Sequence, residues 1–360
     1  MSRPFQRGLW VSACCLVLLA YPVRAQETEP PRRSEEVEAG RTARDEQNRY
    51  DRLVERFKTP YFALDLLLQG VGTFAFEESD RTPSAFAVGT ARIKVHGTLH
   101  RGFGYLLQTD FASSPALLDA RVSYAPSETF RVQAGRYRVP FSYERLTSSA
   151  STDFISRSRI VRALVPGRAV GAGLRATAVT EALELRMGVF NAVYERTRTG
   201  LDAEGEREPG EFLVAGRLAY RSERARQNRT DGWRLTVGTN AGYEATGTSP
   251  RGDIPARFIA GVDARLIVGP MLLAAEGLVE YADTDGFERR NDGYYLTAGI
   301  DLNDANRLLT RLDVFEGTDQ LVLGYNATAT RAASFQTNLV VPLDDAPGVT
   351  RLVVNVQLAF

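Results

Sequence analysis

The sequence is poor in the residue types that carry most specialised chemistry. Only two of its 360 residues are cysteine, Cys14 and Cys15, and only two are histidine, His96 and His100. Both cysteines lie within residues 1–25, whose charged start, apolar stretch and small-x-small ending predict a cleaved secretory signal peptide. The chain left after cleavage would have no thiol, which excludes disulfides, cysteine catalysis and cysteine-ligated metals.

The sequence also lacks net charge, because its 44 basic and 44 acidic residues balance. Neutrality argues against nucleic-acid binding through bulk charge, and 44% hydrophobic residues argue against disorder. Lysine is nearly absent, since every basic residue except Lys58 and Lys94 is arginine. No run of about 18 apolar residues follows the signal peptide, so no transmembrane helix is predicted.

Residues 26–60 form a polar segment behind the signal peptide. Glu27 to Lys58 contains nine acidic and eight basic residues, and Ala43, Tyr50 and Phe57 recur at a spacing of seven. The pattern leaves two alternatives open, a solvated and partly helical periplasmic segment or a short oligomerising coiled coil.

From Tyr61 onward the hydrophobic pattern has a period of two. Between Phe62 and Phe74, apolar side chains alternate with polar ones, as in a strand with one apolar and one polar face. A tilted strand crosses a bilayer with about 9 to 11 residues, and most of these segments are long enough. Such segments begin near residues 62, 85, 103, 117, 130, 169, 183, 211, 232, 254, 271, 293, 307, 320, 333 and 350.

The connections between these segments differ systematically in length. Connections after even-numbered segments are mostly short, such as Pro126 to Thr129, whereas those after odd-numbered segments include long ones, such as Pro140 to Arg168. Short turns at one rim and long loops at the other are typical of outer-membrane barrels, whereas sandwich strands are shorter. Residues 61–360 are therefore predicted to form an all-β, transmembrane antiparallel β-barrel of about 16 strands in the outer membrane.

The last ten residues support the same prediction. Arg351 to Phe360 is a strictly alternating strand that ends on an aromatic residue. This ending resembles the signal that the barrel-assembly machinery recognises in outer-membrane proteins. Phe360 is therefore the candidate assembly signal, and that machinery is an expected partner.

Four stretches around the fifth strand give the chain a family resemblance. Phe130 to Ser142 is followed in order by Leu146 to Ser149, Phe154 to Ser158 and Ala163 to Gly171. Together they resemble the phosphate-selective porin O and P family, with a close match over residues 85–191. The resemblance implies a sixteen-stranded, trimeric, channel-forming barrel in the outer membrane of a Gram-negative bacterium.

The departures from the family pattern concern charge. Arg138 stands where the family commonly has lysine, Ser156 stands where it has an acidic residue, and Lys94 is the only lysine in the predicted barrel. The resemblance therefore implies the fold but leaves phosphate selectivity open.

The segment from Tyr143 to Ala169, behind the fifth strand, is the candidate constriction loop, a third external loop folded into the barrel. It has five arginines against two acidic residues. In a narrow passage, fixed positive charge attracts anions and repels cations, and guanidinium groups fit phosphate and carboxylate. The candidate residues for constriction and anion selectivity are Arg145, Arg157, Arg159, Arg162 and Arg168.

Further cations lie on the polar faces of the strands, which would line the lumen. Candidate lumen residues are Arg92, Lys94, Arg121, Arg131 and Arg175. Acidic residues share these faces, so the charges are either ion pairs that stiffen the wall or a track that guides anions. Arg136 and Arg138 have the opposite parity to Arg131, which leaves open whether a bulge turns them inward or they lie at the rim.

Enzyme chemistry has little support in the sequence. His96 and His100 occur without a nucleophile motif, a phosphate-binding loop or metal-ligand spacing, so no catalytic residue, cofactor or metal site is expected. We expect a water-filled porin, a homotrimer embedded in outer-membrane lipid, that passes phosphate or similar small anions by diffusion and binds no nucleic acid. The alternatives are a general or weakly selective porin for sugars or other small solutes, and an outer-membrane barrel enzyme or adhesin.

Overall fold

The computed structural model describes most of the chain from residue 58 onward. The predicted signal peptide, and all of segment 26–60 except residues 58 and 59, lie outside the described residues. The described ranges are 58–59, 61–76, 84–112, 116–178, 182–191, 212–224, 232–245, 247–249, 252–254, 256–284, 287–343 and 349–360.

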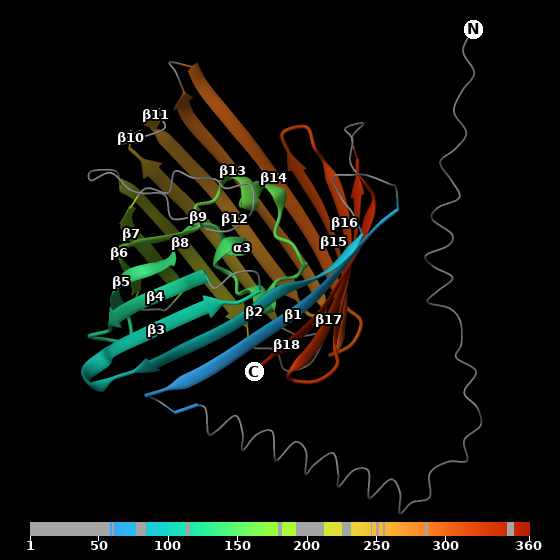
Figure 1. Cartoon of the computed structure of the whole chain (residues 1–360), viewed down its shortest axis with the longest axis horizontal. Coiled ribbons are helices and arrows are strands. Elements are labelled where there is room, and N and C mark those ends of the chain that lie inside the picture. The colour runs from blue at the N-terminus through green and yellow to red at the C-terminus, as the bar shows by residue number, and fades with distance from the viewer. Residues whose placement is uncertain are drawn as a thin grey trace, which may run out of the picture. The chain divides into compact units, whose positions relative to one another are not determined.

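Within these ranges, sixteen antiparallel strands close into one barrel, as the alternating pattern predicts (Figure 1). The seam is formed by the first and last strands, where Leu67 lies opposite Ala359. The barrel strands are β1 (Ala63–Ala75), β2 (Ala85–Thr98), β3 (Phe103–Asp110), β4 (Ala116–Tyr124), β5 (Phe130–Arg138), β6 (Arg168–Thr177), β7 (Leu183–Asn191), β8 (Phe212–Arg224), β9 (Trp233–Glu244), β12 (Arg257–Val268), β13 (Met271–Thr284), β14 (Phe287–Asp301), β15 (Asn306–Phe315), β16 (Gln320–Thr328), β17 (Ala333–Pro342) and β18 (Arg351–Ala359).

Two details differ from the sequence-based expectation. The twelfth barrel strand, β14, begins at Phe287 rather than near residue 293. In addition, β10 (Gly247–Ser249) and β11 (Gly252–Ile254) pair as a small separate sheet where a loop was expected. Strands of three residues are too short to show a period of two, so the sequence pattern could not reveal them.

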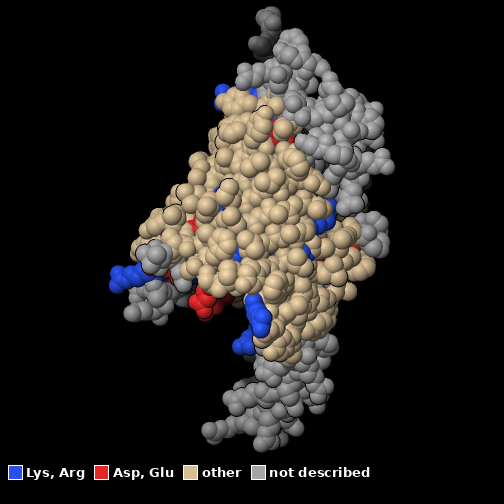
Figure 2. Space-filling model, turned by 90° about the vertical axis from the view of Figure 1, so that its left-hand side faces the viewer, with Lys and Arg blue, Asp and Glu red and all other residues tan. Residues whose placement is uncertain are grey.

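Side chains alternate between the lipid-facing outside and the lumen. On β15, Leu308 is 44% exposed on the outside, whereas Arg311 and Asp313 point inward and are 2% and 0% exposed. Aromatic pairs mark both ends of the outer band: the rings of Phe74 and Phe86 are 5.5 Å apart near the long-loop end, and those of Phe103 and Tyr124 are 4.8 Å apart near the short-turn end. On the face drawn in Figure 2, the described surface is mostly uncharged, as contact with lipid requires.

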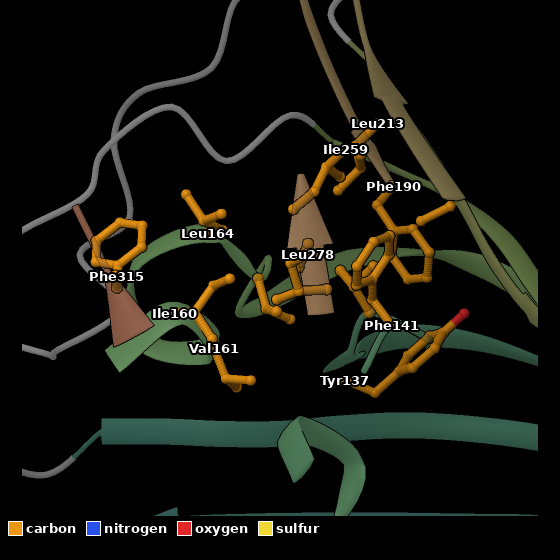
Figure 3. Close-up of a cluster of buried hydrophobic side chains, with 14 of the residues drawn as sticks. Tyr137, Phe141, Ile160, Val161, Leu164, Phe190, Leu213, Ile259, Leu278 and Phe315 are labelled. Carbon is orange, nitrogen blue, oxygen red and sulfur yellow. The ribbon is translucent and has the colours of Figure 1, made fainter. Parts of the chain in front are cut away.

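The segment between β5 and β6 packs inside the barrel through an apolar cluster (Figure 3). It contains the helices α3 (Tyr143–Leu146), η2 (Ser149–Ser151) and α4 (Arg159–Leu164). From this segment, which we call the inner loop (residues 139–167), Phe141 and the buried face of α4 contact inward-pointing residues of the wall. The wall residues in the cluster are Tyr137, Ala169, Phe190, Leu213, Ala215, Ile259, Leu278, Tyr295 and Phe315.

The local sequence sets the bounds of these short helices. Ser142 caps α3 by accepting a hydrogen bond from Arg145 N, and Ser158 caps α4 by accepting one from Val161 N. Pro166 follows Val165, the C-cap residue of α4, at a point where a helix cannot continue. None of the described helices has the length and apolar content needed to cross a membrane.

The structure resolves the orientation of the two arginines that follow Gly135 on β5. Gly135 itself has a φ of 124° and approaches the Ala120 carbonyl closely, which suits glycine alone. Beyond it, Arg136 is buried and its Nε donates to the Leu117 carbonyl. Arg138 turns toward the inner loop, where its Nη1 donates to the carbonyls at 145, 146 and 147.

A second glycine makes room for a buried ion pair. Arg217 on β8 donates to both carboxylate oxygens of Asp263 on β12, at 2.8 and 2.7 Å, although β9 lies between these strands. Gly238 of β9 is opposite Asp263, and a Cβ at this position would overlap the Arg217 guanidinium. The absence of a side chain at residue 238 therefore allows Arg217 to cross the middle strand.

Replacing this glycine should break the pair. Gly238→Ala displaces the guanidinium and leaves the buried Asp263 carboxylate with the Asn240 amide in place of a cation, so we expect the free energy of unfolding in detergent to fall by about 3 kcal/mol. Gly277→Ala on β13 is the matched control, because the nearest atoms to its Cβ would be 3.9 Å away. Urea titration of both variants measures the difference, and equal midpoints would contradict the prediction.

Candidate functional site

Hydrogen bonds fix the inner loop across the lumen. Amide and carboxylate side chains on six strands bind loop backbone atoms through hydrogen bonds of 3.4 Å or less, and Figure 1 draws the loop within the outline of the barrel. The bonds join Gln69 (β1) to Ser149 O, Asn240 (β9) to Ser142 N, Asp313 (β15) to Arg159 N, Asn326 (β16) to Asp153 O, Gln336 (β17) to Thr152 O, Asn338 (β17) to Ile155 N, and Gln357 (β18) to Ala150 O.

Arg311 is the cation at the centre of this attachment. Its Nη1 donates to Glu144 of the loop at 3.2 Å, its Nη2 lies 3.6 Å from Asp313, and its guanidinium stands 4.6 Å from the ring centre of Phe154. Ser158 also donates to Glu144, from both N and Oγ. Burial raises the pKa of Glu144 and outweighs the opposing effects of Arg311 and Ser158.

The inner wall beneath the loop carries an acidic row. Asp263, Glu276, Tyr295 and Asp313 lie directly opposite one another across β12, β13, β14 and β15. All four are at most 5% exposed. The Tyr295 hydroxyl donates to Glu276 at 3.2 Å, and the backbone N of Glu144 donates to it at 3.5 Å. These carboxylates are therefore withdrawn from the open lumen.

The inner wall also carries a row of arginines, on strands β5 to β8. Arg131, Arg175, Arg186 and Arg217 lie opposite one another across β5, β6, β7 and β8. Like charges in directly opposed positions destabilise a sheet. Glu184 offsets part of this repulsion, because it pairs with Arg175 at 2.6 Å and with Arg186 at 2.8 Å.

A cavity of about 590 Å³ lies along this basic side of the lumen. The acidic residues in its lining are Asp65 and Asp119. The cationic residues in its lining are Arg92, Lys94, Arg121, Arg131, Arg138, Arg168, Arg175 and Arg186.

Several of these cations are neutralised by carboxylates. Arg92 pairs with Asp110 at 2.7 Å, Lys94 with Asp65 at 2.5 Å, and Arg168 with Asp119 at 3.2 Å.

Arg121, Arg131 and Arg138 form no ion pair with any residue that the structure describes. The Arg121 guanidinium donates to the Gln133 side chain at 2.9 Å, and Arg138 donates only to backbone carbonyls. The cavity therefore has an excess of positive charge that no neighbouring carboxylate cancels.

The structure separates the two sets of residues that the sequence suggested. All five candidate lumen residues line the cavity: Arg92, Lys94, Arg121, Arg131 and Arg175. Of the five candidate loop residues, only Arg168 lines it, and Arg168 begins β6 instead of belonging to the loop.

The remaining loop arginines are placed outside the lining of this cavity. Arg157 donates to the carbonyls of Glu144 and Thr147, and Arg159 donates to the Thr318 carbonyl. Arg145 is half-buried in α3, and Arg162 is exposed on α4. Burial and repulsion by Arg145 lower the pKa of Arg157 to about 10, so Arg157 stays charged at neutral pH.

Sequence reasoning left one site residue unplaced and did not single out a second kind. The unplaced residue is Arg138, because the register of β5 with β4 and β6 is unbroken through Gly135 and no bulge marks its inward turn. The other is the set of inward amides that attach the loop, such as Asn338 and Gln357. In the sequence these amides resemble any other polar residue that faces the lumen. Their role becomes visible only when the position of the inner loop is known.

A closed sixteen-stranded barrel with an apolar exterior and a charged lumen is the architecture of an outer-membrane porin channel. The chain belongs to the family described as phosphate-selective porin O and P, which matches residues 70–316.

Solved structures share this fold at low sequence identity. The anion-selective porin from Comamonas acidovorans is 15% identical with a TM-score of 0.61, and the match covers 83% of this chain and 99% of that one. OmpF from Salmonella typhi is 12% identical with a TM-score of 0.58, covering 83% and 97%. OprB from Pseudomonas putida is 9% identical with a TM-score of 0.58, covering 83% and 94%. No curated protein is a significant match to the chain.

Removing the central cation should loosen the inner loop. Arg311→Gln leaves Glu144 and Asp313 buried without it, and we expect the free energy of unfolding to fall by about 3–5 kcal/mol. Single-channel recordings should also show larger current fluctuations as the loop detaches. Arg290→Gln is the control, because its pair with Asp292 is exposed and worth at most about 1 kcal/mol. Steady current and unchanged stability in Arg311→Gln would show that Arg311 does not anchor the loop.

Proposed function

We propose that this porin is a passive diffusion channel that prefers anions, with phosphate and similar small anions among its permeants. The observation that carries the proposal is the cavity lining, in which eight cationic residues face two acidic ones. Fixed charge of one sign in a narrow, water-filled passage concentrates counter-ions and excludes ions of like sign.

The placement of the acidic residues supports the same preference. The acidic row is covered by the inner loop, so a permeating ion meets the cavity lining rather than Asp263, Glu276 and Asp313. Arg121, Arg131 and Arg138 are the residues that we assign to anion attraction, since no described carboxylate pairs with them. Transport needs no covalent step, so the proposal is a channel and not an enzyme.

Three further expectations complete the proposal. Residues 1–25 direct export, the barrel works as a homotrimer, and Phe360 is read by the barrel-assembly machinery. The position of Phe360 fits this last role, because its N and O bond to Leu66 of β1 and extend the seam past the end of β18.

Reversal potentials in planar bilayers test the anion preference. In a KCl gradient we expect the dilute side to become negative, because chloride crosses faster than potassium. Arg121→Gln combined with Arg131→Gln should lower the chloride-to-potassium permeability ratio by on the order of tenfold, which corresponds to about 1.4 kcal/mol.

Arg159→Gln is the matched control, because it removes a loop arginine that does not line the cavity. A potential of the opposite sign in the unmodified protein would refute the anion preference. An equal loss of anion preference in Arg159→Gln would show that the loop arginines, and not those of the barrel wall, set the selectivity.

A further inference from the structure

One carboxylate at the short-turn end of the cavity gathers an unusual set of basic groups. Asp65 lies on β1 near this end, and both lysines of the chain contact it, Lys94 at 2.5 Å and Lys58 at 3.9 Å. His96, one of only two histidines in the chain, lies 3.2 Å from it through Nε2. No other described carboxylate has an ion pair with a lysine or a histidine.

Lys94 and His96 compete for the same atom. Both contact Oδ2 of Asp65, whereas Lys58 lies nearest to Oδ1. A neutral imidazole can share Oδ2 with a lysine at little cost. A protonated imidazole brings a second full charge to that oxygen and repels the Lys94 ammonium.

The surroundings of His96 do not cancel that extra charge. Across β3, Leu106 lies opposite His96 and Gln108 lies opposite Lys94, and neither is charged. The next residue in the row is Arg121 on β4, which is positive. On the β1 side, the Leu66 N–H donates a hydrogen bond of 2.8 Å to the O of Phe360, the last residue.

These side chains are open to the lumen. The side chains of Asp65, Lys94 and His96 are 31%, 32% and 36% exposed, and Asp65 and Lys94 line the cavity. Water can therefore exchange protons with His96, and a passing ion can reach Lys94.

We propose that His96 makes the anion preference of this channel depend on pH. When His96 takes up a proton, its imidazolium pairs with the Asp65 carboxylate. The Lys94 ammonium is then free to attract permeating anions. The cluster of Lys58, Lys94, His96 and Asp65 then changes from one net positive charge to two. Histidine is the residue type whose charge ordinarily changes between about pH 5 and 8. The inference rests on the proposed anion-preferring function and adds its regulation.

The test measures the chloride-to-potassium permeability ratio of the full protein at pH 8 and at pH 5.5. One added unit charge acting across roughly 10 Å of water raises the local chloride concentration about twofold and lowers that of potassium about twofold, so we expect the ratio to rise about fourfold on acidification. His96→Gln should keep the ratio of the unmodified protein at pH 8 and lose the rise.

His100→Gln is the matched control. His100 is the only other histidine, lies in the turn η1 (His100–Gly102), and contacts Arg101 rather than Asp65. It should therefore keep the full rise. His96→Arg carries a permanent charge and should give the higher, acid-like ratio at both pH values. This variant also keeps the proposal testable if His96→Gln fails to assemble.

Two outcomes separate this inference from the proposed function. A ratio that favours chloride but does not change with pH, or that rises equally in His96→Gln, would overturn the role of His96 alone. A ratio that favours potassium at both pH values would overturn the anion preference on which it rests.

Discussion

The buried carboxylates on one side of the lumen are the constraint from which the rest of the arrangement follows. Asp263, Glu276 and Asp313 lie in one row on the inner wall, with Tyr295 between the last two, and a charge that is taken out of water needs partners. Arg217 reaches over Gly238 to supply one, the inner loop supplies others through its backbone N–H groups, and Arg311 of β15 lies beside Asp313. The loop is therefore held against this side, and the space that remains open lies against the arginine row.

Period-two alternation predicted the number of strands and most of their starting positions, because every strand in a membrane barrel has one face toward lipid and one toward water. The same rule placed Arg121 and Arg131 on the lumen side, where the structure has them. The rule failed where wall side chains pack against the inner loop. Ile259 and Phe315 point inward although they are apolar, because the loop covers them. The rule also left Arg138 unplaced, and the structure shows it at the end of β5, where it donates to carbonyls of the inner loop.

The loop arginines show why residue type alone does not assign a role. Arg157 and Arg159 were expected to face the pore, yet their guanidinium groups bind backbone carbonyls. A guanidinium has five donors and readily serves such carbonyls. Whether an arginine attracts ions depends on the partners it already has, and those come from strands distant in the sequence. That information is not present in a count of charges along one loop.

The seam between β1 and β18 has a consequence for how the protein can be made. Gln69 donates to Gln357 across this seam, from a position 288 residues earlier in the chain. Until β18 is in place, β1 presents an unpaired edge with open backbone donors and acceptors, which is a template for pairing with other chains. The last strand to be synthesised thus removes both free edges in one step. A chain truncated before β18 would keep them, and such a chain should be prone to aggregation rather than simply less stable.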